Sequence, residues 1–363
     1  GTPGCDNKII YLLNILGFAC FNEPVLLKSY HHHTTNIRNY TQKNAVELPY
    51  HAIFPVLTDE PIANPMQTFD IIRENNNMRN YLEEKMKIDK PFVIPRITGI
   101  ENEVAMAGAM ADQQNNLNKD IFNNFKNVMP VMKKNAGIRL DNMEDIALYS
   151  KKYLEPFHKS EIYAWLEPWS NDVKYIPRSF DFMIVNFPKN KIDSLVFDIF
   201  HNIHNNPWTL ALRGKRILII SDFIESIKEK ISIRDKIYGI DLFPDCEFVF
   251  LKPPQTHGNN SSRKFELEFN DFVKRINDIK DTFDIALCSC GGYGNPICGA
   301  IYNMGKSAIY VGGVLQMYFG IYGERWLKER PDIMRLYLNH HWCRPKESER
   351  PKNYKELENS GYW

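Results

Sequence analysis

The chain lacks an excess of charge of either sign and lacks any long apolar run. Its 363 residues carry 45 Lys and Arg against 44 Asp and Glu, a formal net charge of +1. This balance argues against nucleic acid as a partner, although it leaves room for a local basic pocket. No stretch approaches the ~18 consecutive apolar residues of a membrane span. The nearest one, 9–21, is too short and is interrupted by Asn14, so we expect no membrane-spanning segment.

A regular cysteine framework is also missing. The seven cysteines are odd in number and irregularly spaced along a long chain. Such a pattern is typical of reduced thiols in a cytosol-like compartment rather than of a disulfide scaffold. We therefore expect a cytoplasmic protein.

Apolar runs and amphipathic segments alternate regularly in the last third of the chain. The alternation predicts strands at 216–221, 247–251, 284–288 and 308–311, and helices at 223–238, 263–279 and 295–304. Regular β-α alternation is typical of an α/β, doubly wound, mostly parallel Rossmann-like sheet. Upstream, the pattern predicts strands at 92–94, 163–165 and 180–187, and helices at 101–111, 121–131 and 142–153. A helical extension at 1–45 and a Pro-punctuated connector at 46–89, ending in a charged helix near 78–88, precede a domain at 90–363.

Paired glycines follow two of the predicted strands. Strand 284–288 leads into Ser289, Gly291, Gly292, Tyr293 and Gly294, and strand 308–311 ends at Gly312 and Gly313. The carboxyl edge of a parallel sheet is where nucleotides bind, and glycine lets backbone N–H groups approach an anion. The pattern is neither GxGxxG nor a Walker loop. A tight turn without a ligand is an equal alternative.

Several motifs resemble, in order, a family of glycosyltransferases of bacterial and viral polysaccharide clusters of the GT-D type. They are PRITGIE (95–101), NPWTLALRGKRILII (206–220), the GGYG turn, VGGVLQMYFGIYGERW (311–326) and the tail 341–363. The resemblance implies a GT-D-like fold and a hexosyl- or deoxyhexosyltransferase. Its partners would be a nucleotide-sugar donor and a growing glycan as acceptor, in the host cytoplasm if the chain is viral. Residues 4–40 resemble the tail of a GT-A type domain, which implies a larger multidomain protein.

The resemblance also implies a metal-binding turn. Relatives carry Gly-Asp-Gly-Glu, whose acids bind a divalent metal, where this chain has Thr98, Gly99, Ile100 and Glu101. Glu101 is the implied Mn²⁺ or Mg²⁺ ligand and catalytic acid, but Gly99 replaces the aspartate and leaves metal dependence open. Arg96 either clamps the diphosphate or forms an ion pair with Glu101 or Glu103.

Four further residues are site candidates with structural alternatives. Asp222 ends a predicted strand, as a general base or a helix N-cap. Gln316 contacts the base or sugar, or caps a helix. Arg325 is a candidate phosphate ligand, and Glu324 beside it a candidate catalytic acid.

Two other classes of function compete with the transferase. A non-catalytic module that binds glycan or scaffolds a partner would account for the missing acid at Gly99. An S-adenosylmethionine-dependent methyltransferase also places glycines after a strand, although usually after the first strand of its domain. The sequence leaves the donor, the acceptor and the oligomeric state undecided.

Overall fold

The computed structural model describes residues 71–113, 128–165, 177–258 and 263–350, with residues 9, 12–13, 16–18, 354 and 361–362 toward the ends. Its helices and strands are α2 (Ile71–Ile88), β1 (Val93–Ile94), α3 (Ile100–Gln113), α5 (Met129–Val131), α6 (Met143–Lys159), β2 (Ile162–Trp165), α7 (Pro177–Asn186), β3 (Asn190–Asp193), β4 (Arg216–Ile220), α8 (Ile224–Lys230), α9 (Asp235–Tyr238), β5 (Glu247–Leu251), α10 (Phe265–Asn277), β6 (Ile285–Cys288), α11 (Gly294–Asn303), β7 (Ser307–Tyr310), α12 (Glu324–Glu329) and α13 (Pro331–Tyr337).

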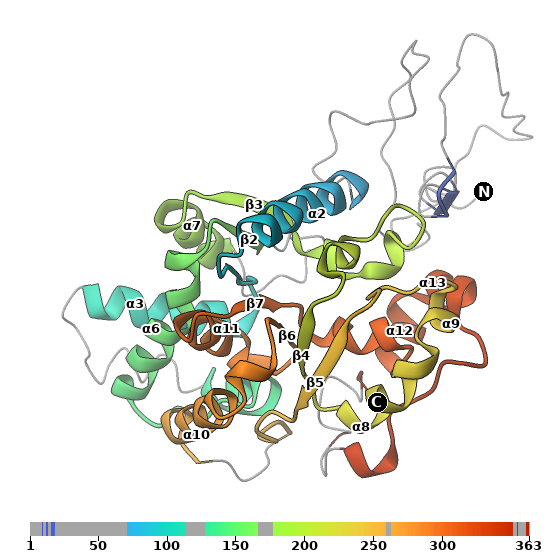
Figure 1. The fold of residues 1–363 in the computed structure, drawn as a ribbon. Helices are drawn as coiled ribbons and strands as arrows, with labels where there is room; N and C mark the ends of the chain where they lie inside the picture. The colour runs from blue at the N-terminus through green and yellow to red at the C-terminus, as the bar shows by residue number, and fades with distance from the viewer. Residues whose placement is uncertain are drawn as a thin grey trace, which may run out of the picture.

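The main sheet has five strands in the order β1-β7-β6-β4-β5, and every pair in it is parallel (Figure 1). The chain runs from β4 out to β5, then crosses back over β4 to β6 and on to β7. This reversal makes the sheet doubly wound and confirms the predicted fold class. The switch point lies between β4 and β6.

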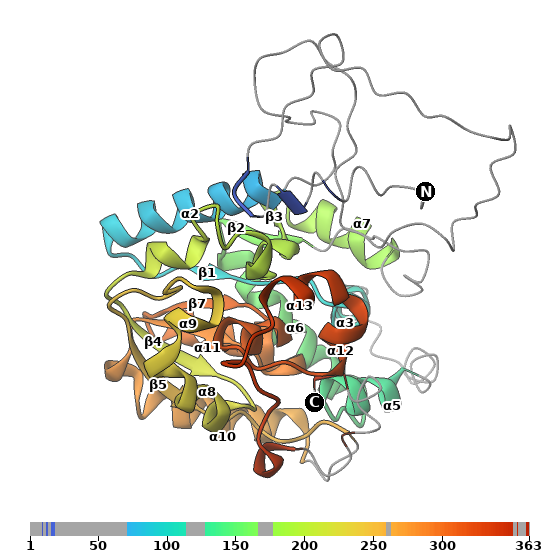
Figure 2. The same cartoon turned by 90° about the vertical axis from the view of Figure 1, so that its right-hand side faces the viewer.

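Helices cover both faces of the sheet (Figures 1 and 2). Along β4, Ile217 and Ile219 point into one core, while Leu218 and Ile220 point into the other. Helices α2, α9, α12 and α13 line the first core, and α3, α6, α10 and α11 line the second. Because both faces are buried, the strands consist of near-continuous apolar residues rather than alternating ones.

A second, two-stranded parallel sheet, β2-β3, continues from the end of β1. Ala164 donates from its N–H to the Pro95 carbonyl (2.8 Å) and accepts from the Ile97 N–H (2.9 Å). The predicted strand at 163–165 is therefore confirmed as β2. These bonds hold the segment after β1 straight for two residues beyond the strand.

Two predicted elements differ from the structure. The strand predicted at 180–187 is wrong, because these residues lie in helix α7 and its end. Met183 and Phe187, four residues apart, are buried, whereas Ile184 and Val185 are exposed, which is a helical period that a short apolar run conceals. The single helix predicted at 223–238 is instead α8, a 3-10 turn at Ile231–Ile233 and α9. Its β-branched isoleucines at the break disfavour a continuous helix.

Upstream of β1, α2 buries Ile71, Met78 and Leu82 in the first core, so residues 71–88 share the core of the sheet. The extension at 1–45, with its GT-A-like segment, falls almost entirely outside the described residues, as does most of the helix predicted at 121–131. Within the described part of the chain, no helix is long and apolar enough to cross a membrane.

Candidate functional site

The candidate site is the carboxyl edge of the main sheet. Arg96 follows β1, Gly312 follows β7, Ser289 follows β6 and Asp222 follows β4. Parallel strands bring these four turns to one edge. Neighbouring strands lie about 4.8 Å apart, so the ends of β1 and β4, with two strands between them, are about 14 Å apart. Glu101, near β1, and Asp222, at β4, therefore belong to different parts of the edge.

At the β1–β7 part of the edge, Arg96 is fixed through its backbone and its side chain. Asn295, fully buried, accepts from the Arg96 N–H (3.0 Å) and donates to the Arg96 carbonyl (2.8 Å). The guanidinium donates from Nη1 to the Val311 carbonyl (2.6 Å) and lies 5.7 Å from the centre of the Phe197 ring. We call Arg96, Gly312, Arg325 and Asp198 the arginine side of the edge.

Glycine at position 312 makes room for that guanidinium. A Cβ at Gly312, where φ is +83°, would lie 2.6 Å from Arg96 Nη1. Among the described residues, no ion pair joins Arg96 to a carboxylate, so the pairing with Glu101 or Glu103 that we considered is not its contact. A guanidinium held by a backbone carbonyl keeps its charge available to an anion. Two of the predicted donor-binding residues, Arg96 and Gly312, thus lie in contact.

Glu101 lies in the first turn of α3, close to three buried tyrosines. Burial raises the pKa values of Tyr149 and Tyr310, and the negative charge of Glu101 raises them further. The hydroxyl of the third, Tyr153, lies 2.9 Å from Thr98 Oγ1, within hydrogen-bond distance. The structure therefore brings Thr98 and Glu101 to the same part of the edge as Arg96.

The GGYG turn packs against the protein's own side chains. A Cβ at Gly291 would lie 2.2 Å from His257 Nε2, one at Gly292 would lie 2.4 Å from Ile138 Cγ1, and one at Gly294 would lie 2.2 Å from Tyr310 Cζ. We call these three glycines the glycine side of the edge. Approaches this close require glycine for packing alone, which favours the alternative of a structural turn.

Tyrosine hydroxyls hold the carbonyls of that turn. Tyr310 donates to the Gly291 carbonyl (2.8 Å), and Tyr149 donates to the Gly292 carbonyl (3.0 Å). Ser289 donates from its N–H to the Ile220 carbonyl (2.8 Å) and so continues the sheet ladder. Tyr293 is buried, with its ring stacked 5.8 Å from Phe265. The glycine side is a rigid, well-bonded corner.

Tyr362, which the sequence pattern did not indicate, joins three predicted residues. A Cβ at Gly313 would lie 2.3 Å from its ring, and Arg325 Nη1 donates to its hydroxyl (2.7 Å). Gln316 donates to the carbonyls of Ile321 (3.2 Å) and Tyr362 (3.4 Å). Gln316 is almost fully buried, so its amide group links two backbone segments and is not exposed to solvent.

The two remaining carboxylate candidates have side-chain partners. Asp222 accepts from Gln255 Nε2 (2.5 Å) across the loops that follow β4 and β5. Phe223, not Asp222, is the N-cap residue of α8. Glu324 forms ion pairs with Arg344 and, at 3.8 Å, with Lys328. Asp222 thus lies at the switch point, whereas Glu324 is held by two cations.

A divalent metal, which the family resemblance implies, has few protein ligands here. No group of three or more His, Cys, Asp or Glu that could hold a metal ion occurs among the described residues. Position 99 offers no carboxylate, although a Cβ built there would meet no atom within 4 Å. The side chains do not fit a metal held by the described protein residues alone, so we derive no chemical step through a metal.

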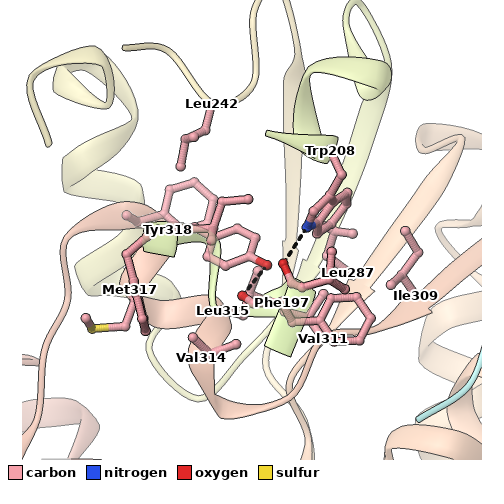
Figure 3. Packing of buried hydrophobic residues seen from close by; sticks show 14 of the residues in the cluster. Phe197, Trp208, Leu242, Leu287, Ile309, Val311, Val314, Leu315, Met317 and Tyr318 are labelled. Atoms are coloured by element: carbon pink, nitrogen blue, oxygen red, sulfur yellow. Dashed lines mark hydrogen bonds between the residues drawn. The ribbon is translucent and has the colours of Figure 1, made fainter. Parts of the chain in front are cut away.

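Sequence reasoning missed Asp198 as well as Asn295. Burial raises the pKa of the Asp198 carboxyl, and the charges of Arg330, Arg96 and Arg325 oppose that rise. Figure 3 shows the neighbouring Phe197, whose carbonyl accepts from the Tyr318 hydroxyl (2.7 Å), packed near Val311. An isolated Asp in an apolar 3-10 segment carries no motif that would have identified it.

Comparisons with known proteins give a distant likeness. No family model and no curated protein matches the sequence. Among solved structures, the chain is similar to "A New Glycosyltransferase (DUF1792) from Streptococcus sanguinis", at 12% identity and a TM-score of 0.41, covering 69% of this chain and 82% of that one. It is also similar to a selenomethionine-substituted "domain of unknown function 1792", at 11% identity and a TM-score of 0.37, covering 69% and 84%. At such values, neither structure assigns a role to any residue of this chain.

Proposed function

We propose that this chain is a glycosyltransferase that moves a sugar from a nucleotide-diphosphate donor to a hydroxyl of a growing glycan. One observation carries the proposal. Arg96 holds its guanidinium against Gly312 at the carboxyl edge of a doubly wound sheet, bonded to a backbone carbonyl, with Glu101 starting the helix that follows. An unneutralised cation and a carboxylate at such an edge are what a diphosphate leaving group and a hydroxyl nucleophile require. The ordered sequence motifs agree with this proposal.

In the proposed reaction, an acceptor hydroxyl attacks the anomeric carbon of the donor sugar. The bond from that carbon to the diphosphate oxygen breaks, and its electron pair leaves with the nucleotide diphosphate. Arg96 and Arg325 offset the charge that develops on the leaving group. The N–H groups of Gly291, Gly292 and Gly313 are the proposed second contact with the nucleotide. Those of Tyr293 and Gly312 already donate to the carbonyls of Cys290 (3.1 Å) and Cys288 (3.0 Å).

The acceptor's proton must pass to a base. We propose Glu101 for this role, because it lies on the arginine side of the edge, near Arg96 and Thr98. Asp222, about three strand spacings away, is the second candidate. Glu324 is the third, and its pairs with Arg344 and Lys328 suit an orienting role. A divalent metal, if the reaction uses one, would rely on Glu101 and on the phosphates of the donor.

A thermal-shift screen tests the proposal. The melting temperature is measured with the UDP, GDP, dTDP and CDP forms of sugars, with and without Mn²⁺, since a ligand that binds the native state raises it by mass action. We expect a rise with one nucleotide class. Sugar transfer with that donor should fall at least about 100-fold in Glu101→Gln, in keeping with the loss of a general base. Glu103→Gln, two residues along the same helix turn, is the matched control and should keep its activity.

A non-catalytic glycan-binding module is the second candidate function. The glycine at position 99, where the family resemblance implies an acid, favours it. This alternative predicts binding without turnover, and it predicts that Glu101→Gln leaves every measurable activity unchanged. A screen in which no nucleotide shifts the melting temperature would contradict the transferase and favour the module.

A further inference from the structure

The segment that contains Asp198 lies directly beside the arginine side of the edge. The guanidinium of Arg96 is 5.7 Å from the Phe197 ring centre, and the Phe197 carbonyl is held by the Tyr318 hydroxyl. Figure 3 shows Phe197 beside Val311, the residue that follows β7, with Tyr318 near Phe197. Asp198 is the next residue in the chain, so its position is tied to the residues proposed to bind the diphosphate.

Three arginines act on Asp198 without forming an ion pair with it. Arg330, Arg96 and Arg325, in that order, lower the pKa of the carboxyl against the effect of burial. Among the described residues, the charged or titratable group nearest to the Asp198 carboxylate is His201 Nε2, at 3.9 Å, and none of the three guanidinium groups comes within 4.0 Å of it. The guanidinium groups are thus close enough to act on the charge of Asp198, but they lie beyond hydrogen-bond distance from its carboxylate.

Trp326 of helix α12 and Arg330, the residue that follows this helix, add two buried donors to this neighbourhood. Trp326 Nε1 and Arg330 Nε are buried and have no hydrogen-bond partner among the residues that the structure describes. The two residues are one helical turn apart, since the Arg330 N–H donates to the Trp326 carbonyl (3.0 Å). A buried donor without a partner costs free energy, so both donors favour a ligand that accepts hydrogen bonds. The Trp326 ring also packs edge to face with Phe200, 6.5 Å away, which ties it to the Asp198 segment.

The mixture of groups selects one kind of ligand. A phosphate only accepts hydrogen bonds, so it could pair with the N–H donors but not with the Asp198 carboxylate. An ammonium only donates, so it could pair with Asp198 but not with the N–H donors. A hydroxyl donates to a carboxylate and accepts from an N–H at once. Rings such as Trp326 also favour contact with the apolar face of a sugar. A neutral, hydroxyl-rich ring therefore satisfies the acceptor and the donors together.

We infer that Asp198, Trp326 and Arg330 bind the sugar ring of the donor, and that this ring is a neutral, hydroxylated sugar. The inference rests on the proposed function, because it places the sugar next to the diphosphate that Arg96 would hold. Asp198 accepts from hydroxyls of the ring, and the N–H groups of Trp326 and Arg330 donate to its oxygens. Asp198 is a binding residue here and takes no proton in the reaction.

The test compares the affinity of the nucleotide sugar with that of its nucleotide diphosphate, by calorimetry. In the unaltered protein we expect the sugar to improve affinity by about tenfold, which corresponds to about 1.4 kcal/mol. In Asp198→Asn the ratio should fall toward one while the nucleotide diphosphate binds as well as before. Trp326→Phe keeps an aromatic ring but removes the indole N–H, and it should lower the ratio in part. Asp193→Asn, a buried acid five residues earlier that caps a 3-10 turn through Oδ1, is the matched control and should keep the ratio.

A second experiment uses free sugars and does not depend on binding of the nucleotide. Saturation-transfer NMR with glucose, galactose, N-acetylglucosamine and rhamnose should give a signal that Asp198→Asn reduces severalfold. If a nucleotide binds but its affinity ratio is the same in Asp198→Asn, the sugar site is overturned and the transferase stands. If no nucleotide binds but a free-sugar signal depends on Asp198, the transferase falls and the sugar site stands. If neither binds, both fall.

Discussion

The glycine side and the arginine side of the sheet edge are built in opposite ways. On the glycine side, each glycine is closed off by a neighbouring side chain (His257, Ile138 or Tyr310), and tyrosine hydroxyls hold its carbonyls. On the arginine side, a guanidinium is bonded to a backbone carbonyl, and the buried donors of Trp326 and Arg330 have no partner among the described residues. The more conspicuous motif is thus the better packed, and the less conspicuous one is where we propose that a ligand binds.

Gly294→Ala should have the largest effect on stability. The new Cβ would lie 2.2–2.5 Å from three atoms of the buried Tyr310 ring, whose hydroxyl is bonded to Gly291. Overpacking of this kind costs about 1–3 kcal/mol. We expect the upper end of this range, because burial and the hydrogen bond to Gly291 both keep the Tyr310 ring from moving aside. Chemical denaturation measures the loss. Gly99→Ala, whose Cβ would meet no atom within 4 Å, should change the free energy of unfolding by less than about 0.5 kcal/mol. Equal stability of the two variants would show that the glycine side is not a packing device.

Arg96→Ala should weaken nucleotide-diphosphate binding by at least about tenfold, because a charge-assisted hydrogen bond is worth about 1.5–3 kcal/mol. Calorimetry with the nucleotide found by the screen measures this loss. The control is Arg213→Ala, which removes a solvent-exposed arginine paired with Asp245; its affinity should not change. If both variants bind equally well, the arginine side does not hold the diphosphate.

Asp198→Asn should alter the pH dependence of stability. Because burial raises the pKa of Asp198 in the folded state, the folded protein binds the proton more tightly than the unfolded chain. The stability that this provides is complete below the unfolded pKa of about 4 and is lost as the pH rises through the folded pKa. The variant should therefore melt a few degrees higher than the parent at pH 7, and at the same temperature near pH 4.

Melting curves from pH 4 to pH 8 test this expectation. A variant that melts well below the parent at pH 7 would mean that the three arginines stabilise the Asp198 charge more than burial destabilises it. That outcome would place Asp198 as a counter-ion of the arginine side.

Gly99→Asp should have the smallest effect on stability and a specific effect on metal binding. Position 99 has room for a side chain, and its backbone lies outside the left-handed region. A carboxylate just before α3 would also interact favourably with the dipole of that helix. We expect a change of less than about 0.5 kcal/mol in the free energy of unfolding. The rise in melting temperature caused by Mn²⁺ should be larger in the variant than in the parent. An Mn²⁺ effect that is equal in the two proteins would show that Glu101 does not form a metal site with position 99.

The strands of the sheet could be predicted because buried parallel strands consist of apolar residues throughout. β4, β5, β6 and β7 all appear within a residue or two of their predicted bounds. The prediction of a strand at 180–187 was wrong because a short apolar run fits a helix as well as a strand. Length and period separate the two only over more residues than this segment has.

Part of the candidate site was also accessible to sequence reasoning. Arg96, Gly312 and Glu101 were predicted from their places after strands and from the family resemblance. Asn295 and Asp198 were not, because what matters about them is their place near Arg96, to which Asn295 is hydrogen-bonded across 199 residues of sequence. No local pattern records a hydrogen bond across that separation.

The sequence by itself determined the class of fold and the edge where a ligand would bind, because hydrophobic period and glycine placement are local properties of the chain. The tertiary structure decided how the parts of that edge differ. Strand order placed β1 beside β7 and so brought Arg96 against Gly312, while close packing filled the space around the glycine turn. These outcomes depend on contacts between distant residues, and only the folded chain specifies them.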